Sequence, residues 1–194
     1  MDKRPLLDSS ALLALAGGFG VRGPATGEHR MQIEPREATF RLVINKGERR
    51  LLVFRSVGGG EELDRTLKVG LGSQPTGSKT KQGDGATPEG EYYITHRNAA
   101  SRYHLSLGIS YPNASDASVG LTRGLLTRTQ YQSIIRAIRQ LEKPPQNTAL
   151  GGDIFIHGGG TTGDWTAGCI ALENQDIEYL FARLPLKTKV TIFP

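Results

Sequence analysis

The alternation of short apolar segments and turn residues across residues 38–72 constrains the fold more than any other feature of the sequence. Residues 39–45 and 49–55 are rich in β-branched and large apolar residues, and a turn-forming Lys-Gly-Glu triplet at 46–48 separates them. Two such segments joined by a short turn are typical of an antiparallel hairpin. The sequence therefore predicts a sheet-rich domain that begins near residue 38.

The same pattern predicts further strands along the rest of the chain. Each is an apolar segment bounded by glycine, proline or other turn-forming residues. The predicted strands lie at 63–72 after a triple-glycine turn, at 91–97 after a long polar loop from 73 to 89, at 103–113 as a strand or loop, at 154–156, and at 189–193.

Two helices interrupt this β pattern. Apolar residues recur at helical spacing from Thr129 to Lys143, at Tyr131, Ile134, Ile135, Ile138 and Leu141. Thr127 and Gln130 match a capping box at the start of this helix, and Pro144 and Pro145 end it. The exposed basic face, with Arg136, Arg139 and Lys143, is typical of solvated surface. A second helix is expected to begin at Asn174, an N-cap type of residue, and to bury Ile177, Leu180 and Phe181.

The first 37 residues differ from this domain. They begin with basic residues and carry an apolar run at 11–16, but Asp8, Ser9 and Ser10 interrupt the position of a signal-peptide core. Residues 1–37 are therefore expected to be a degenerate signal peptide or a flexible leader, followed by one domain at residues 38–194. A G-x-G-x-x-G spacing at glycines 18, 20 and 23 is a chance match, because no strand and helix flank it.

Composition excludes several classes of function. The net charge is +5, from 24 basic and 19 acidic residues, but no basic stripe with aromatic platforms is present, so no nucleic-acid partner is expected. No window from residue 38 onward has the apolar length of a membrane span. The single cysteine excludes an intrachain disulfide. His96 and His104 have no metal-motif spacing with His157, and no metal is expected.

Residues 153–174 contain the candidate catalytic residues. A buried-type strand at 154–156 delivers His157 at its end, and a glycine-rich loop then presents Cys169. A nucleophilic thiol needs a base, a partner that orients the base, and donors for the oxyanion formed in acyl transfer. A carbonyl at Gly158 or Gly159 can orient the imidazole of His157. The N–H groups of Gly168 and Cys169 are candidate oxyanion donors.

His157 and Cys169 each also have a purely structural interpretation. A lone histidine is commonly a hydrogen-bonded core residue, and a lone cysteine commonly a small buried hydrophobe. Their spacing, with glycine beside both, favours a catalytic pair, in which His157 is the base and Cys169 the nucleophile.

This segment resembles the signature of the YkuD-type L,D-transpeptidase domain, in which a His-Gly pair is followed by Ser or Thr, a Gly-Cys pair and an apolar residue. Upstream, the run from Lys81 to Gly90, with Gly83-Asp84 and Thr87-Pro88, is similar to the K-x-G-D-x-x-T-P-x-G run of the same family. By their residue types alone, the residues of this run are turn formers that feed a strand. The resemblance extends over about residues 38–194.

The resemblance implies a mainly β, sandwich-like or barrel-like domain with two or three short helices. It further implies that Cys169 forms a thioester with a peptidoglycan stem peptide, that Thr166 and the Gly168 backbone line the site, and that no cofactor takes part. The family commonly has Arg two residues after the cysteine, where this chain has Ala171, so a subgroup with altered substrate recognition is expected. Trp165, Arg97 and Arg102 are candidate substrate-binding residues, although loop packing and solvation explain them equally well.

Two other functions remain open on the sequence. Ala171 is compatible with a cysteine hydrolase of the same fold, a peptidoglycan L,D-carboxypeptidase or amidase, and the third alternative is a non-catalytic cell-wall binding module. Peptidoglycan lies outside the cytoplasmic membrane, so a periplasmic or cell-wall location is expected from the substrate. The sequence does not indicate an oligomeric state.

Overall fold

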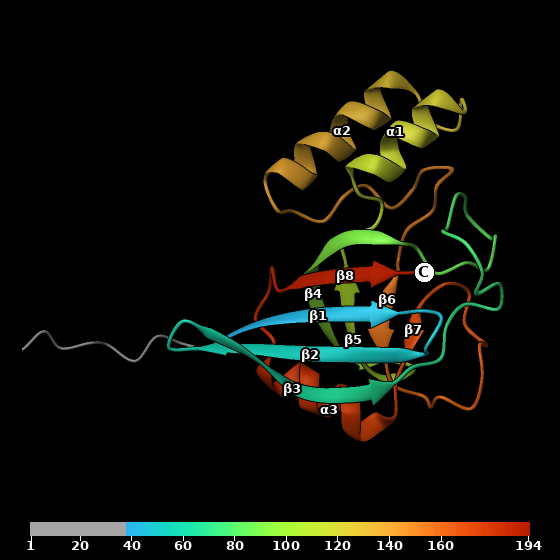
Figure 1. Ribbon diagram of the computed structural model, residues 1–194. Coiled ribbons are helices and arrows are strands. Elements are labelled where there is room, and N and C mark those ends of the chain that lie inside the picture. Colours follow the sequence, from blue (N-terminus) through green and yellow to red (C-terminus); the bar gives the residue numbers. More distant parts are fainter. Residues whose placement is uncertain (1–37) are drawn as a thin grey trace, which may run out of the picture. The chain divides into compact units, whose positions relative to one another are not determined.

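The computed structural model describes residues 38–194, so the predicted leader and its three glycines at 18, 20 and 23 lie outside the described residues. Eight strands and three helices make up the described part (Figure 1). In chain order they are β1 (Thr39–Asn45), β2 (Arg50–Val57), β3 (Gly60–Lys68), β4 (Gly90–Ser101), β5 (His104–Ile109), α1 (Ala114–Thr122), α2 (Arg128–Arg139), β6 (Phe155–His157), β7 (Ile170–Ala171), α3 (Asn174–Arg183) and β8 (Lys189–Phe193).

The strands form one curled sheet in the order β3-β2-β1-β8-β4-β5-β6-β7. Neighbouring strands are antiparallel except β1 with β8 and β6 with β7, which are parallel. Single bridges from Gly70 to Ala171 and from Gly72 to Thr166 join the segment after β3 to the β7 region, so the two ends of the sheet approach each other. The predicted mainly β domain with a few short helices is confirmed.

Alternation along the central strands builds the core. Leu42 and Ile44 of β1 are fully buried, and the residues between them on the other face are not. In register, Leu42 pairs with Val53 of β2 and with Val190 of β8. All three are fully buried, so they form one apolar row across three strands. Each such side chain contributes about 1.5–3 kcal/mol on burial.

The predicted helix near residues 129–143 is present as α2, with the expected capping box between Thr127 and Gln130. It ends earlier than predicted, because Leu141 adopts a left-handed φ of 54° and the Glu142 N–H donates back to the Ala137 carbonyl. This closing pattern terminates a helix without proline. The prediction that Leu141 belongs to the buried stripe is wrong, since Leu141 is 46% exposed.

Helix α1 was not predicted. Its capping box is made by Asn113 and Asp116, and the residues it buries, Ala117 and Gly120, are small and weakly apolar. The apolar periodicity that reveals a helix in a sequence is therefore faint here. α1 lies beside α2, and the two form a helical pair next to the sheet (Figure 1).

Helix α3 begins at Asn174, as predicted, and buries Ile177 and Leu180, but Phe181 is only half-buried. The cap differs from the prediction, because Glu173 occupies the N-cap position and the side chain of Asn174 accepts a hydrogen bond from the Gly159 N–H instead, at 2.9 Å. α3 therefore holds the loop that follows β6. None of the helices within residues 38–194 has the length and hydropathy needed to cross a membrane.

Candidate active site

Strands β6 and β7 bring His157 and Cys169 to one face of the sheet. In the parallel register Ile156 lies beside Ile170, so Phe155 lies beside Cys169. Side chains two residues apart along a strand share a face, which places His157 on the same face as Phe155. Residues twelve positions apart in the sequence therefore point to one side of the sheet.

That side is a cavity of about 640 Å³, which His157 and Cys169 both line. Arg102, Trp165 and Thr166, which the sequence indicated, line it as well. Further lining residues that the sequence did not indicate are Asn98, Ala100, Ser101, Tyr103, Ser106, Asp153, Phe155 and Ala167.

His157 is buried, with 3% of its surface exposed, and its Nδ1 lies 2.6 Å from the Gly158 carbonyl oxygen. A carbonyl only accepts, so Nδ1 carries the hydrogen and Nε2 is left as the basic nitrogen. Burial lowers the pKa of His157 below its ordinary value and the charge of Arg102 adds to this effect, while the bond to Gly158 opposes it. The imidazole is therefore neutral near pH 7.

Two aromatic side chains fix the plane of this imidazole. The Tyr103 ring stacks on His157 with a centroid distance of 4.6 Å and an interplanar angle of 21°. Trp165 meets the imidazole edge-on at 5.6 Å, and the guanidinium of Arg102 lies 4.7 Å from the Tyr103 centroid. Tyr103 was missed by sequence reasoning, because only the β4–β5 hairpin brings it next to His157.

The thiol of Cys169 is partly exposed and held by the backbone. The Phe155 N–H donates to Sγ at 3.4 Å, and Sγ lies 3.6 Å from the carbonyl oxygen of Asp153. Asp153 has a left-handed φ of 52°. Burial raises the pKa of the Cys169 thiol, and the Phe155 N–H and the charge of Lys79 offset part of this rise. The resting thiol is therefore protonated at neutral pH.

Of the two predicted oxyanion donors, one is engaged. The Gly168 N–H donates to Thr166 Oγ1 at 3.1 Å, and the Thr166 hydroxyl donates to the Cys169 carbonyl at 2.8 Å. Gly168 itself is buried and has a φ of 130°, a conformation open to glycine. Thr166 thus fixes the turn before the nucleophile, and of the two predicted donors the Cys169 N–H remains the candidate for an oxyanion.

The loop from residue 73 to 89 supports this turn from behind. A Cβ on Gly168 would lie 2.7 Å from the Ala86 carbonyl oxygen, so the two backbones are in close contact. The Asp84 carboxylate holds the loop by accepting from Lys79 at 2.8 Å and from three backbone N–H groups. Burial alone would raise the pKa of Asp84, but the Lys79 bond and these N–H groups lower it to about 2. The two sequence motifs therefore meet in space.

Three predicted or considered positions lie elsewhere. Arg97 does not line the cavity and stacks over Phe181, 4.7 Å from its centroid. Gly158 acts through its carbonyl and does not line the cavity either. Ala171 is fully buried and pairs with Gly70 through backbone hydrogen bonds.

The other two histidines within residues 38–194 have partners of their own. His96 stacks edge-on against Phe155, and His104 pairs with Glu178 at 2.6 Å. Among residues 38–194, no group of three or more His, Cys, Asp or Glu side chains is arranged to hold a metal ion.

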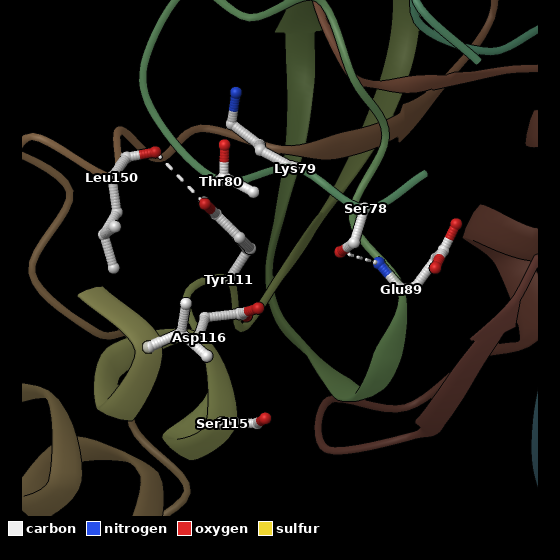
Figure 2. A pocket seen from close by; sticks show the side chains of 9 residues that line it. Ser78, Lys79, Thr80, Glu89, Tyr111, Ser115, Asp116 and Leu150 are labelled. Atoms are coloured by element: carbon white, nitrogen blue, oxygen red, sulfur yellow. Dashed lines mark hydrogen bonds between the residues drawn. The ribbon is translucent and has the colours of Figure 1, made fainter. Parts of the chain in front are cut away.

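A second cavity, of about 280 Å³, lies between the 73–89 loop and α1 (Figure 2). Its polar groups are held by structural partners: the Tyr111 hydroxyl donates to the Leu150 carbonyl, and Ser78 Oγ accepts from the Glu89 N–H. Asp116 accepts from the Tyr92 hydroxyl at 3.0 Å. This cavity holds no thiol or imidazole and is a feature of the scaffold.

Known proteins are similar to this chain in sequence or in fold. YafK of Escherichia coli strain K12, named as a candidate L,D-transpeptidase, is 30% identical over 118 residues, which are 59% of this chain and 47% of YafK. The crystal structure of the helical cell shape determining protein Pgp2 from Campylobacter jejuni matches with a TM-score of 0.55 and 23% identity, over 82% of this chain and 49% of Pgp2. Bd1075 from Bdellovibrio bacteriovorus matches with a TM-score of 0.51 and 21% identity, over 79% and 47%.

The matched region spans about half the length of these relatives. The two structures show that the fold of this chain is a known one, and the family assignment comes from the sequence itself. The L,D-transpeptidase catalytic domain (YkuD) matches residues 39–192, which include both motifs and the whole sheet except the last residue of β8, and the protein therefore belongs to the L,D-transpeptidase catalytic domain family.

Proposed function

We propose that this protein is a cysteine-dependent L,D-transpeptidase that acts on the stem peptides of bacterial peptidoglycan. One observation carries the proposal: Cys169 and His157 line the same cavity, and the Gly158 carbonyl fixes the tautomer of His157 that leaves Nε2 basic. A thiol and an oriented neutral base in one cavity are the two groups that acyl transfer by a cysteine requires.

In the first half of the proposed reaction, His157 Nε2 takes the proton of the Cys169 thiol as Sγ attacks the carbonyl carbon of the third stem residue. The carbonyl oxygen becomes an oxyanion, which the Cys169 N–H stabilises. The carbon–nitrogen bond then breaks, and His157 returns its proton to the departing amine of the terminal D-alanine. A thioester on Cys169 remains.

In the second half, an amine of another stem attacks the thioester carbonyl. His157 removes a proton from the attacking nitrogen and delivers it to the departing Cys169 sulfur, so the thiol and the neutral imidazole are restored. The raised pKa of Cys169 and the lowered pKa of His157 favour this neutral resting pair over a thiolate–imidazolium pair. Activation therefore takes place during the attack, as general-base catalysis.

Trp165 and Arg102 are proposed to contact the substrate. The Trp165 ring is 39% exposed and forms a wall of the cavity next to the imidazole. Arg102 supplies a positive charge at the cavity rim for a stem carboxylate. Arg97, which stacks on Phe181 outside the cavity, is not part of this proposal.

A second candidate function is hydrolysis by the same thioester, as an L,D-carboxypeptidase or amidase. The observation that favours it is Ala171, a small buried residue that offers no cation where an arginine is common in the family. Because peptidoglycan is the proposed substrate in both cases, we also propose a periplasmic or cell-wall location.

Incubation of the purified protein with disaccharide-tetrapeptides tests the proposal. The transpeptidase should release D-alanine and form 3-3 linked dimers, the hydrolase should release D-alanine without dimers, and Cys169→Ala should do neither. A Cys169→Ala variant as active as the wild type would refute the nucleophile. Unchanged substrate with the wild-type protein would leave only the role of a cell-wall binding module.

A further inference from the structure

A row of three polar side chains crosses the sheet next to the candidate nucleophile. Asn98 of β4 pairs with Ser106 of β5, and Ser106 pairs with His157 of β6. Residues paired directly in an antiparallel sheet share a face, and all three line the cavity that contains Cys169. The row therefore extends from the imidazole to the edge of the cavity.

Ser106 lies in close contact range of His157. The Gly158 N–H donates to the Leu105 carbonyl and the Ile109 N–H to the Ile154 carbonyl. Hydrogen-bonded positions alternate along an antiparallel pair, so Ser106 and His157 form a non-hydrogen-bonded pair, the kind in which side chains are closest.

Ser106 is 3% exposed and lines the cavity. Its hydroxyl can both donate and accept a hydrogen bond. A ligand that fills the cavity can therefore form a hydrogen bond with this hydroxyl.

The remaining groups of the row indicate what that ligand is. Asn98 Oδ1 already accepts from the Ala100 N–H at 2.9 Å, so the amide presents its two N–H donors to the cavity. Arg102 adds a positive charge to the same cavity wall. Hydrogen-bond donors beside a cation suit an anionic acceptor, and a carboxylate is the anion that a peptide carries at its end.

We propose that Asn98 and Ser106, together with Arg102, bind the free C-terminal carboxylate of the peptide that donates its acyl group to Cys169. This inference rests on the proposed function, in which His157 gives its proton to the leaving amine. An amino acid carries its carboxylate on the carbon next to its amine, so a leaving residue held at His157 has its carboxylate beside Ser106. The subsite selects bonds that precede a terminal residue.

Calorimetry on the Cys169→Ala variant tests this subsite without consuming the peptide. The probes are a stem tetrapeptide with a free C-terminus and the same peptide as a C-terminal carboxamide. We expect the acid to bind about tenfold tighter than the carboxamide, as a charged hydrogen-bonded contact provides. Ser106→Ala and Asn98→Ala, each added to Cys169→Ala, should weaken binding of the acid several-fold and leave the carboxamide unaffected.

Two further variants sharpen the test. Asn98→Asp keeps the bond from Ala100 but places a negative charge in the row, and should reverse the preference so that the carboxamide binds better. Ser118→Ala, on the exposed side of α1, is the matched control and should keep the preference of the parent. Thermal unfolding of each variant verifies that it is folded.

Equal binding of acid and carboxamide by the Cys169→Ala parent would overturn the proposal, as would a preference unchanged in Ser106→Ala and Asn98→Ala. Failure of the proposed function looks different. In that case Cys169 produces no D-alanine from the acid, although the acid still binds tighter than the carboxamide and the preference still depends on Ser106 and Asn98.

Discussion

His157 is restrained on three sides, by the Gly158 carbonyl at Nδ1, by the Tyr103 ring on one face and by the Trp165 edge. These contacts fix the ring plane and remove water from the imidazole. The pKa of His157 is lowered as a result. The direction of this shift can be tested, because only the neutral ring accepts a proton from the thiol.

We expect the rate of Cys169 acylation to fall on the acid side with a midpoint below pH 6.5, the ordinary value for histidine. Protonation of His157 as the pH drops through its lowered pKa removes the base. Tyr103→Ala should expose the imidazole to water and move this midpoint upward, whereas Tyr103→Phe, which keeps the stacked ring, should not. The measurement is the pH profile of the acylation rate for the three proteins. A wild-type midpoint at or above pH 6.5 would contradict this explanation.

The cavity residues that sequence reasoning missed are those placed by strand register. His157 and Cys169 stand out in the sequence because glycine flanks both. Tyr103, Ser106 and Asn98 are ordinary residues of a β-hairpin, and nothing local distinguishes them from a solvated face. Their relevance arises only when β5 pairs with β6 at one particular offset.

At the level of elements, the loop from residue 73 to 89 acts as a support for the turn that carries Cys169. Its central ion pair is nearly buried, with side-chain exposures of 3% for Lys79 and 14% for Asp84. Removing one partner of a buried pair leaves an uncompensated charge.

Lys79→Met should therefore destabilise the protein by about 3–5 kcal/mol, the typical cost of breaking a buried pair. Lys81→Met, two residues away and exposed, should cost less than about 0.5 kcal/mol. Urea unfolding at pH 7 measures both. Equal effects of the two substitutions would show that the ion pair does not hold the loop.

The same pair predicts acid sensitivity. The pKa of Asp84 is about 2 in the folded protein and 3.8 by its ordinary value, so the stabilisation is complete above about pH 4 and is lost as the pH falls toward 2. Its size is on the order of 2 kcal/mol. Unfolding of the wild type and Asp84→Asn should differ by less at pH 2.5 than at pH 6, and a difference that does not change with pH would contradict the pairing.

Helix α3 holds the glycine-rich loop after His157 through Asn174, which accepts from the Gly159 N–H. We expect Asn174→Ala to lower the rate of Cys169 acylation about tenfold, because losing a bond worth about 1 kcal/mol lets the loop and the Gly158 carbonyl shift. Gln175→Ala, an exposed neighbour, is the matched control. The rates should be compared at equal stability, and equal rates for both variants would remove the positioning role of Asn174.

Most strands and helices were predictable from the sequence, because each produces a regular spacing of apolar residues. Strands β1, β2 and β8 and helix α2 have clear alternation or helical spacing. α1 lacks such a signal because its buried face consists of alanine and glycine, although its Asn113–Asp116 capping box was available in the sequence. The early end of α2 could not be predicted from the residue types. The left-handed position after a helix is usually glycine or asparagine, and here it is Leu141.

For the molecule as a whole, the order of strands could not be obtained from local pattern. The C-terminal β8 inserts between β1 and β4, and the bridges from Gly70 and Gly72 bring the far end of the sheet to the active-site turn. Such pairings join residues a hundred positions apart and depend on the global packing of the sheet. The spacing of apolar residues alone did not determine how the strands are arranged. The resemblance of two motifs to one family supplied the fold.

Global stability should also depend on Asp116, which joins α1 to the sheet through Tyr92. Burial raises its pKa to about 6, against the bonds from Asn113 and Tyr92 that lower it. The folded protein then keeps a proton that the unfolded chain, with a pKa near 3.8, releases. The Asp116 proton therefore makes the free energy of unfolding fall as the pH rises from about 4 to about 6, by at most roughly 3 kcal/mol.

Asp116→Asn should remove this dependence, because the amide oxygen still accepts both bonds and carries no charge. Urea unfolding across pH 4–7 should show the wild type losing stability relative to Asp116→Asn as the pH rises. Parallel curves for the two proteins would indicate that Asp116 is ionised in the folded state throughout.

The central claim is that Cys169 accepts an acyl group. Intact-mass spectrometry after incubation with a carbapenem tests it most directly, since a β-lactam carbonyl offers the thiol an acyl group that is slow to leave. We predict that the wild-type mass increases by one carbapenem, that peptide mapping places the adduct on Cys169, and that Cys169→Ala and His157→Gln give no adduct or a much slower one. An unmodified wild-type protein, or an adduct that persists in Cys169→Ala, would contradict the account.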